Sequence, residues 1–149
     1  MTIRTLLTTL ALTLFCLTPC IAQAQERTKV EVILVMASNS NEGVDPQLKP
    51  YAETLQRLFR FSTYQQKDRK ILSIEVPGGM TTNLFGGTSL QLGLQPIAGS
   101  KLPVNLDWRR GQQKLLTTLV RLNPGTPAVI GGPQAENTGT YLLIVRWQK

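Results

Sequence analysis

Short segments of alternating apolar and polar residues, separated by turn-forming residues, constrain the fold of this chain more than any other feature of its sequence. The alternation is clearest at 90–95 and 104–108. A period of two is typical of strands with one wet face, and short connections favour antiparallel neighbours. Strands are therefore predicted at 29–37, 61–67, 71–76, 90–95, 104–108, 115–122, 128–130 and 141–147. Turns are predicted at 68–69, 77–79, 109–112 and 123–126, where Asp, Asn, Gly or Pro occurs.

Two segments depart from simple alternation. Residues 29–37 form a β-branched apolar run, which is typical of a strand buried on both faces. Residues 46–60 place apolar side chains at helical spacing after Asp45, a helix-capping residue, and Pro46. Pro50 removes one backbone hydrogen bond, so the regular helix is expected to begin near it. The sequence predicts a β-rich α+β fold over 25–149, an antiparallel twisted sheet or small sandwich covered by one amphipathic helix, as a single domain.

The first 24 residues have the pattern of a signal peptide. Arg4 gives a positively charged start, residues 6–17 form an apolar run, and Ala22 and Ala24 offer small side chains before a cleavage point. The apolar run is shorter than the roughly 20 residues that span a bilayer. We therefore expect cleavage after Ala24, export to the periplasm or out of the cell, and no membrane span in the mature form.

Both cysteines of the chain, Cys16 and Cys20, lie in this leader. Residues 17–20 resemble a lipobox, which would attach lipid at Cys20, but Pro19 stands where a small residue is usual. With the leader removed, the chain has no thiol for a disulfide, for metal binding or for nucleophilic catalysis. Its stability is then expected to come from core burial.

Enzymatic chemistry has few candidate groups in this chain. There is no His, the commonest general base and metal ligand, and we expect neither a metal nor a cofactor. Residues 39–45 carry oxygen ligands but lack the spacing of a calcium loop. The glycine pairs at 78–79, 86–87 and 131–132 open no helix as a phosphate loop would, and are predicted turns or bulges. Paired carboxylates could hydrolyse glycosides, and the candidates are Glu42, Asp45, Asp68, Glu75, Asp107 and Glu136.

Basic residues gather in two short groups within a chain of net charge +7. If the two predicted turns lie at one end of the sheet, these groups form one patch, and two nearby aromatic residues could stack on a ligand. Such a patch suits an anionic lipid head group or wall polymer, and nucleic acid is not an expected partner of an exported protein. The predicted ligand-binding set comprises Lys67, Arg69, Lys70, Arg109, Arg110, Tyr64 and Trp108.

Residues 116–132 run from an alternating segment through a Gly-containing turn to a short apolar segment that ends on Gly131 and Gly132. This run resembles the C-terminal hairpin region of bacterial secretin domains, and the resemblance extends over residues 90–132. The chain shows no counterpart of the pore-forming segments of a secretin. The resemblance implies a small envelope protein with a related hairpin, acting as an accessory component of a secretion system.

Export without a recognisable catalytic group predicts a non-enzymatic binding or structural module of the cell envelope. The expected partner is another envelope protein or an anionic envelope polymer. The terminal strand at 141–147 is a candidate for edge pairing with a partner. Accessory work in a secretion system and carboxylate-dependent hydrolysis of envelope polymers are the alternatives.

Overall fold

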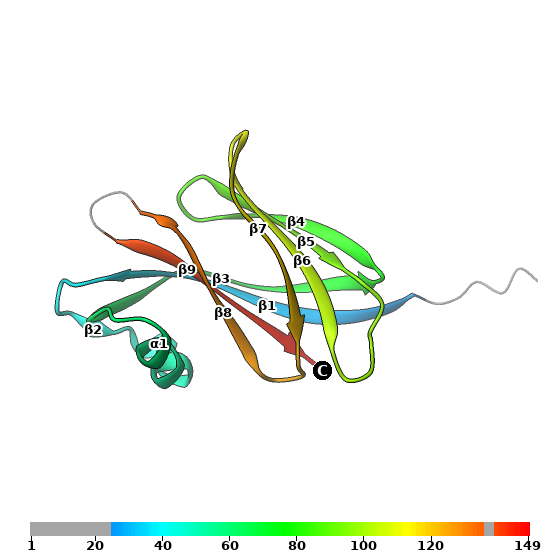
Figure 1. Cartoon of the computed structure of the whole chain (residues 1–149), viewed down its shortest axis with the longest axis horizontal. Helices are drawn as coiled ribbons and strands as arrows, with labels where there is room; N and C mark the ends of the chain where they lie inside the picture. Colours follow the sequence, from blue (N-terminus) through cyan, green and yellow to red (C-terminus); the bar gives the residue numbers. More distant parts are fainter. Residues whose placement is uncertain (1–24, 136–138) are drawn as a thin grey trace, which may run out of the picture.

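Two mostly antiparallel sheets pack face to face, and a short helical segment covers the outer face of the larger sheet (Figure 1). The computed structural model describes residues 25–135 and 139–149, so the leader and its predicted cleavage point lie outside the described residues. The predicted β-rich α+β fold is confirmed. In chain order the elements are β1 (Glu26–Ser38), β2 (Gly43–Val44), the 3-10 segment η1 (Pro46–Tyr51), α1 (Ala52–Leu58), β3 (Thr63–Val76), β4 (Gly78–Leu84), β5 (Thr88–Leu94), β6 (Leu102–Arg110), β7 (Gln113–Leu122), β8 (Pro127–Gln134) and β9 (Thr140–Gln148).

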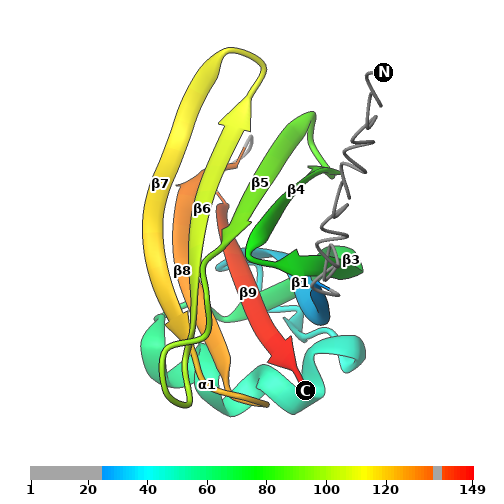
Figure 2. The ribbon, with the colours of Figure 1, turned by 90° about the vertical axis from the view of Figure 1, so that its right-hand side faces the viewer.

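The order of the strands decides which of them are open to a partner. The five-stranded sheet runs β2-β3-β1-β9-β8, and the four-stranded sheet runs β4-β5-β6-β7. Strands β3 and β4 lie side by side at one border of the sandwich, and β7 and β8 at the other (Figure 2). The prediction that the terminal strand 141–147 forms an edge is wrong, because β9 lies between β1 and β8 and pairs with both.

Strand β1 divides the core in two. Val30, Val32 and Leu34 face the four-stranded sheet, whereas Ile33 and Val35 face the helical segment. The prediction that the strand at 29–37 is buried on both faces is thereby confirmed for its apolar residues. The same strand also carries a buried carboxylate, whose side chain needs partners inside the protein.

The predicted helix at 46–60 is split into two short parts. Residues Pro46–Tyr51 form a 3-10 segment, and the α-helix covers only Ala52–Leu58. Asp45 caps the segment as predicted, because its Oδ1 accepts a hydrogen bond from the backbone N–H of Gln47 at 2.9 Å. Pro50 lacks a backbone N–H, and the regular helix begins after it. No helix within residues 25–135 and 139–149 is long and apolar enough to cross a membrane.

Strand β3 is continuous, although two strands joined by a turn at 68–69 were predicted. It pairs with β1 along its whole length, and the register shifts opposite Leu34 and Val35. The shift leaves Lys67 as the extra residue of a β-bulge, which keeps the strand paired through a polar stretch. A turn is predicted at 77–79, but in the structure β4 already begins at Gly78. The strand at 78–84 is not predicted from the sequence.

The turn predicted at 123–126 forms, and the N–H of Thr126 donates to the carbonyl of Asn123 at 3.2 Å. It joins β7 to β8, which lie in different sheets and do not pair with each other. Strands β7 and β8 therefore form no hairpin with each other. The glycine pair at 86–87 lies in a turn, and the pair at 131–132 lies at a register shift of β8. Both agree with the prediction of turns or bulges.

Candidate functional site

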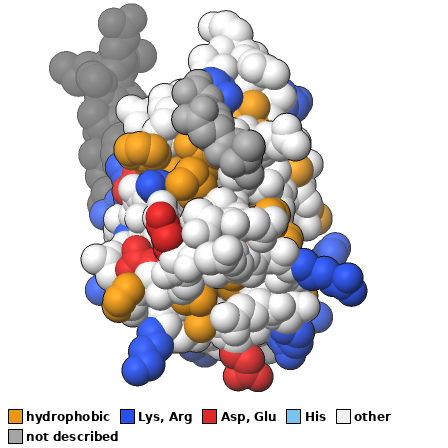
Figure 3. All heavy atoms as spheres, turned by 90° about the vertical axis from the view of Figure 1, so that its left-hand side faces the viewer, with side chains coloured by type: hydrophobic (Ala, Val, Ile, Leu, Met, Phe, Trp, Pro, Cys, Tyr) orange, Lys and Arg blue, Asp and Glu red, His pale blue; other side chains and the backbone are white. Residues whose placement is uncertain are grey.

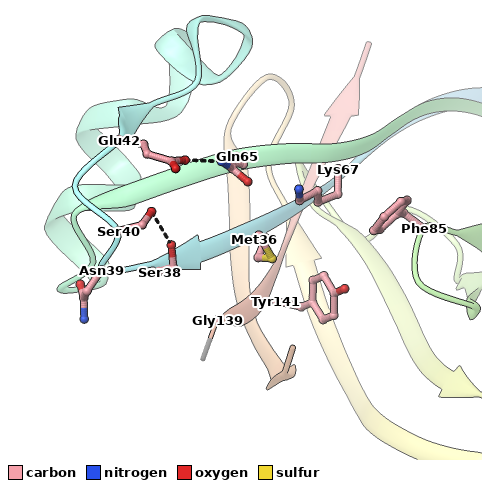
Figure 4. A pocket seen from close by; sticks show the side chains of 10 residues that line it. All are labelled: Met36, Ser38, Asn39, Ser40, Glu42, Gln65, Lys67, Phe85, Gly139 and Tyr141. Carbon is pink, nitrogen blue, oxygen red and sulfur yellow. Dashed lines mark hydrogen bonds between the residues drawn. The ribbon is translucent and has the colours of Figure 1, made fainter. Parts of the chain in front are cut away.

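A cleft of about 610 Å³ lies at one end of the sandwich. At this end β1, β3 and β9 extend beyond the four-stranded sheet (Figure 1). This volume is in the range of small-ligand sites. The end of β1 and the loop after it, the start of β3, the β4–β5 turn and the start of β9 form its walls (Figure 4). The space-filling view of this end shows hydrophobic side chains exposed beside acidic and basic ones (Figure 3).

One wall of the cleft is polar and is held in place by hydrogen bonds. The Ser38 and Ser40 hydroxyl oxygens lie 3.2 Å apart, and the Gln65 amide donates to Glu42 Oε2 at 2.6 Å. Behind this wall, Thr63 Oγ1 accepts from Ser40 Oγ at 3.1 Å and from the backbone N–H of Glu42 at 2.9 Å. The β1–β2 loop is thereby fixed against β3, and the wall presents hydroxyl, amide and carboxylate groups in set positions.

The other wall is apolar apart from one lysine (Figure 4). Met36, Tyr141 and the exposed Phe85 line it. The backbone N–H of Phe85 donates to Asp68 Oδ2 at 3.1 Å, which ties the β4–β5 turn to β3. The ammonium nitrogen of Lys67 lies 5.9 Å from the centroid of the Phe85 ring, a cation–π distance. The cleft thus brings together an exposed aromatic ring and a cation.

The structure does not gather the predicted basic patch into one site. Lys67 lines the cleft, whereas Arg69 binds a buried carboxylate on the face that meets the helical segment. Arg109 lies in the other sheet, with its Nη2 2.8 Å from Asp107 Oδ2, and this hydrogen bond holds the pKa of Asp107 below its usual value. Lys70 pairs in register with Val32, and Arg110 ends β6.

The expected stacking role of Tyr64 and Trp108 is wrong, because both side chains are fully buried. Tyr64 Oη donates to the carbonyl oxygens of Leu55 and Phe59, at 3.2 and 3.0 Å, and so fixes α1 to β3. Burial raises the pKa of Tyr64. Trp108 packs between the two sheets. Both residues stabilise the fold and are closed to a ligand.

The five described carboxylates among those proposed for hydrolysis each have a separate partner. Only Glu42 among the described carboxylates lines the cleft, and Glu136 lies outside the described residues. In residues 25–135 and 139–149, no group of three or more Asp and Glu side chains is placed to hold a metal. The observed pairs are Glu42 with Gln65, Asp45 with the backbone N–H of Gln47 and Gln66, Asp68 with the N–H of Phe85, Glu75 with Arg27, and Asp107 with Arg109.

A buried ion cluster, which the sequence reasoning missed, fastens η1 to the larger sheet. Glu31 accepts a hydrogen bond from Tyr51 Oη at 2.9 Å, and its closest oxygen–nitrogen distances to Arg69 and Arg146 are 2.5 and 2.7 Å. Burial by itself would raise the pKa of Glu31, but the hydrogen bonds and the two positive charges outweigh it and lower the pKa. Burial and the bond to Glu31 raise the pKa of Tyr51. The available signal was a lone glutamate inside the apolar run 29–37.

No protein family, curated protein or solved structure matches this chain. The resemblance of residues 90–132 to secretin domains therefore stays a prediction, and the assignment of function rests on the chemistry of the cleft.

Proposed function

We propose that the chain is an exported, non-enzymatic binding module of the cell envelope, and that its ligand occupies the end cleft. The observation that carries the proposal is the Phe85 ring, 53% exposed and anchored through its backbone, which faces a preorganised polar wall across the cleft. A concave surface that joins apolar contact to a few convergent polar groups is the usual form of a ligand site. Lys67 favours an anionic envelope polymer as the partner over a neutral one.

The groups in the cleft suit recognition better than catalysis. Glycoside hydrolysis needs two carboxylates on either side of the scissile bond. Among the described residues that line the cleft, Glu42 is the only carboxylate, and the Gln65 amide engages one of its oxygens. The remaining lining groups can donate and accept hydrogen bonds but supply no second acid or base of that kind.

Export predicts a defined N-terminus for the purified protein. When the full chain is expressed in cells, the mature form is expected to begin at Gln25, free or cyclised, because cleavage follows Ala24. Intact-mass and N-terminal mass spectrometry of the envelope or culture fraction check this. An acylated Cys20 would instead assign a lipid anchor, and an uncleaved product in the cytosol would contradict export.

Replacing Phe85 with Ala is expected to weaken the binding of the protein to isolated cell envelopes about tenfold, since tenfold corresponds to about 1.4 kcal/mol of lost contact. Co-sedimentation with envelopes of the source organism measures the dissociation constant. Leu119, 41% exposed in the other sheet, is the matched control, and Leu119→Ala should bind like the wild type. If the Phe85→Ala variant binds as tightly as the wild type, the cleft is not the binding site. If the wild type does not bind, the envelope is not the target.

A further inference from the structure

We infer that the cleft takes an acidic sugar unit, with its ring stacked on Phe85 and its carboxylate bound by Lys67. This inference rests on the proposed binding function and names the ligand class of the same site. It follows from the way the two walls divide the polar and apolar groups (Figure 4).

A pyranose has an apolar C–H face and a rim of hydroxyl groups that both donate and accept hydrogen bonds. The Phe85 ring offers a flat, polarisable surface that suits the apolar C–H face, in a cleft that Met36 also lines. The polar wall suits the hydroxyl rim, because Ser38 and Ser40 carry hydroxyls and Glu42 carries an acceptor-only carboxylate. Their positions are set by Thr63 and Gln65 before a ligand arrives, which reduces the entropy lost on binding.

The lysine makes the site selective for an acidic sugar. Among the residues that the structure describes, Lys67 forms no ion pair, and its ammonium nitrogen lies 5.9 Å from the centroid of the Phe85 ring. A carboxylate carried by a ring that stacks on Phe85 would therefore come within reach of the ammonium. Lys67 sits at the β-bulge of β3, so its place on the strand is set by the pairing of β1 with β3.

The balance of charge argues against ligands that depend on many negative groups. One cation and one carboxylate line the cleft among the described residues, which suits a ring that brings a single carboxylate to Lys67 and a hydroxyl to Glu42. A phosphate-rich ligand or an anionic membrane surface would find no second cation there. A peptide that binds by strand addition would need backbone hydrogen-bonding groups at a strand edge. The polar wall of this cleft offers side-chain hydroxyl, amide and carboxylate groups instead.

The test titrates the protein, purified after expression of the full chain, with galacturonic acid oligomers, with galactose oligomers of the same length and with polyglutamate. Isothermal calorimetry gives the affinities. The galacturonate oligomer should bind at least tenfold more tightly than the galactose oligomer, and Lys67→Gln should abolish this preference. Phe85→Ala should weaken both sugars about tenfold, whereas Lys114→Gln and Leu119→Ala, placed on β7 away from the cleft, should leave both unchanged.

Several outcomes would overturn the inference. Equal binding of polyglutamate and galacturonate would show attraction by charge alone, and a galacturonate affinity unchanged by Phe85→Ala would place the sugar elsewhere. A protein that binds envelopes through Phe85 but is not displaced by galacturonate would retain the binding function and lose the acidic sugar. Loss of envelope binding by the wild type would end both proposals.

Discussion

Replacing Gly132 with Ala is expected to destabilise the protein by about 3 kcal/mol or more, at the upper end of the cost of overpacking a core. An added Cβ at this position would overlap Cζ3 of Trp108, and would lie 2.6 Å from Cη2 of the same ring and 2.8 Å from the carbonyl oxygen of Tyr141. The indole cannot move aside easily, because it is fully buried and its ring centroid lies 6.5 Å from that of Tyr141. Urea unfolding followed by circular dichroism measures the loss.

The adjacent glycine provides the matched control. A Cβ at Gly131 would meet only Cε1 of Phe59, at the ordinary contact distance of 3.6 Å. Neither glycine has a positive φ, so Ala reduces the freedom of the unfolded chain equally at both positions. Gly131→Ala should therefore lie within about 0.5 kcal/mol of the wild type, the usual range for tolerated surface changes. Equal stability of the two variants would contradict the packing of Trp108 against Gly132.

Trp108 and Gly132 show what the local sequence pattern could and could not predict. The alternation of Val104, Leu106 and Trp108 correctly predicts a strand, and the glycine pair 131–132 correctly predicts an irregular one. Their contact joins β6 to β8 across the two sheets, and no local pattern encodes it. The same limit explains the error at β9. An apolar terminal segment fits an edge or a centre equally well, and only the order of the strands decides.

Fewer residues of the candidate site than elements of the fold could be predicted from the sequence. Of the seven residues proposed for ligand binding, Lys67 alone lines the cleft. The others were grouped because they are neighbours in sequence, but the β-bulge at Lys67 interrupts the alternation along β3, so that Arg69 lies on the face opposite the cleft. Phe85 lay in a segment without a predicted role. Its backbone is held by the hydrogen bond between the β4–β5 turn and Asp68, a contact between distant segments.

Replacing Glu31 with Gln is expected to destabilise the protein by roughly 2–4 kcal/mol at pH 7, because hydrogen bonds to charged groups contribute about 1.5–3 kcal/mol each and two arginines lose their partner. The Glu31 side chain is 1% exposed, whereas those of Arg69 and Arg146 are 45% and 31% exposed. The arginines can therefore turn partly to water, which keeps the cost below that of a fully buried unpaired charge. The change in the urea midpoint at pH 7 measures the effect.

The pH dependence of this difference tests the ion cluster itself. The pKa of Glu31 is lowered by folding from its ordinary 4.5, so its contribution is fully present above that pH and is lost as the pH falls through the folded value. The gap in stability between the wild type and Glu31→Gln should be fully present at neutral pH and should shrink as the pH falls below 4.5. Glu75→Gln is the control, because the Glu75 and Arg27 side chains are 46% and 62% exposed and such a pair contributes less than about 1 kcal/mol. A gap that persists undiminished at pH 3 would show that Gln fails at this position because its amide N–H group faces the donors that Glu31 accepts from, and that the charge of Glu31 does not stabilise the fold.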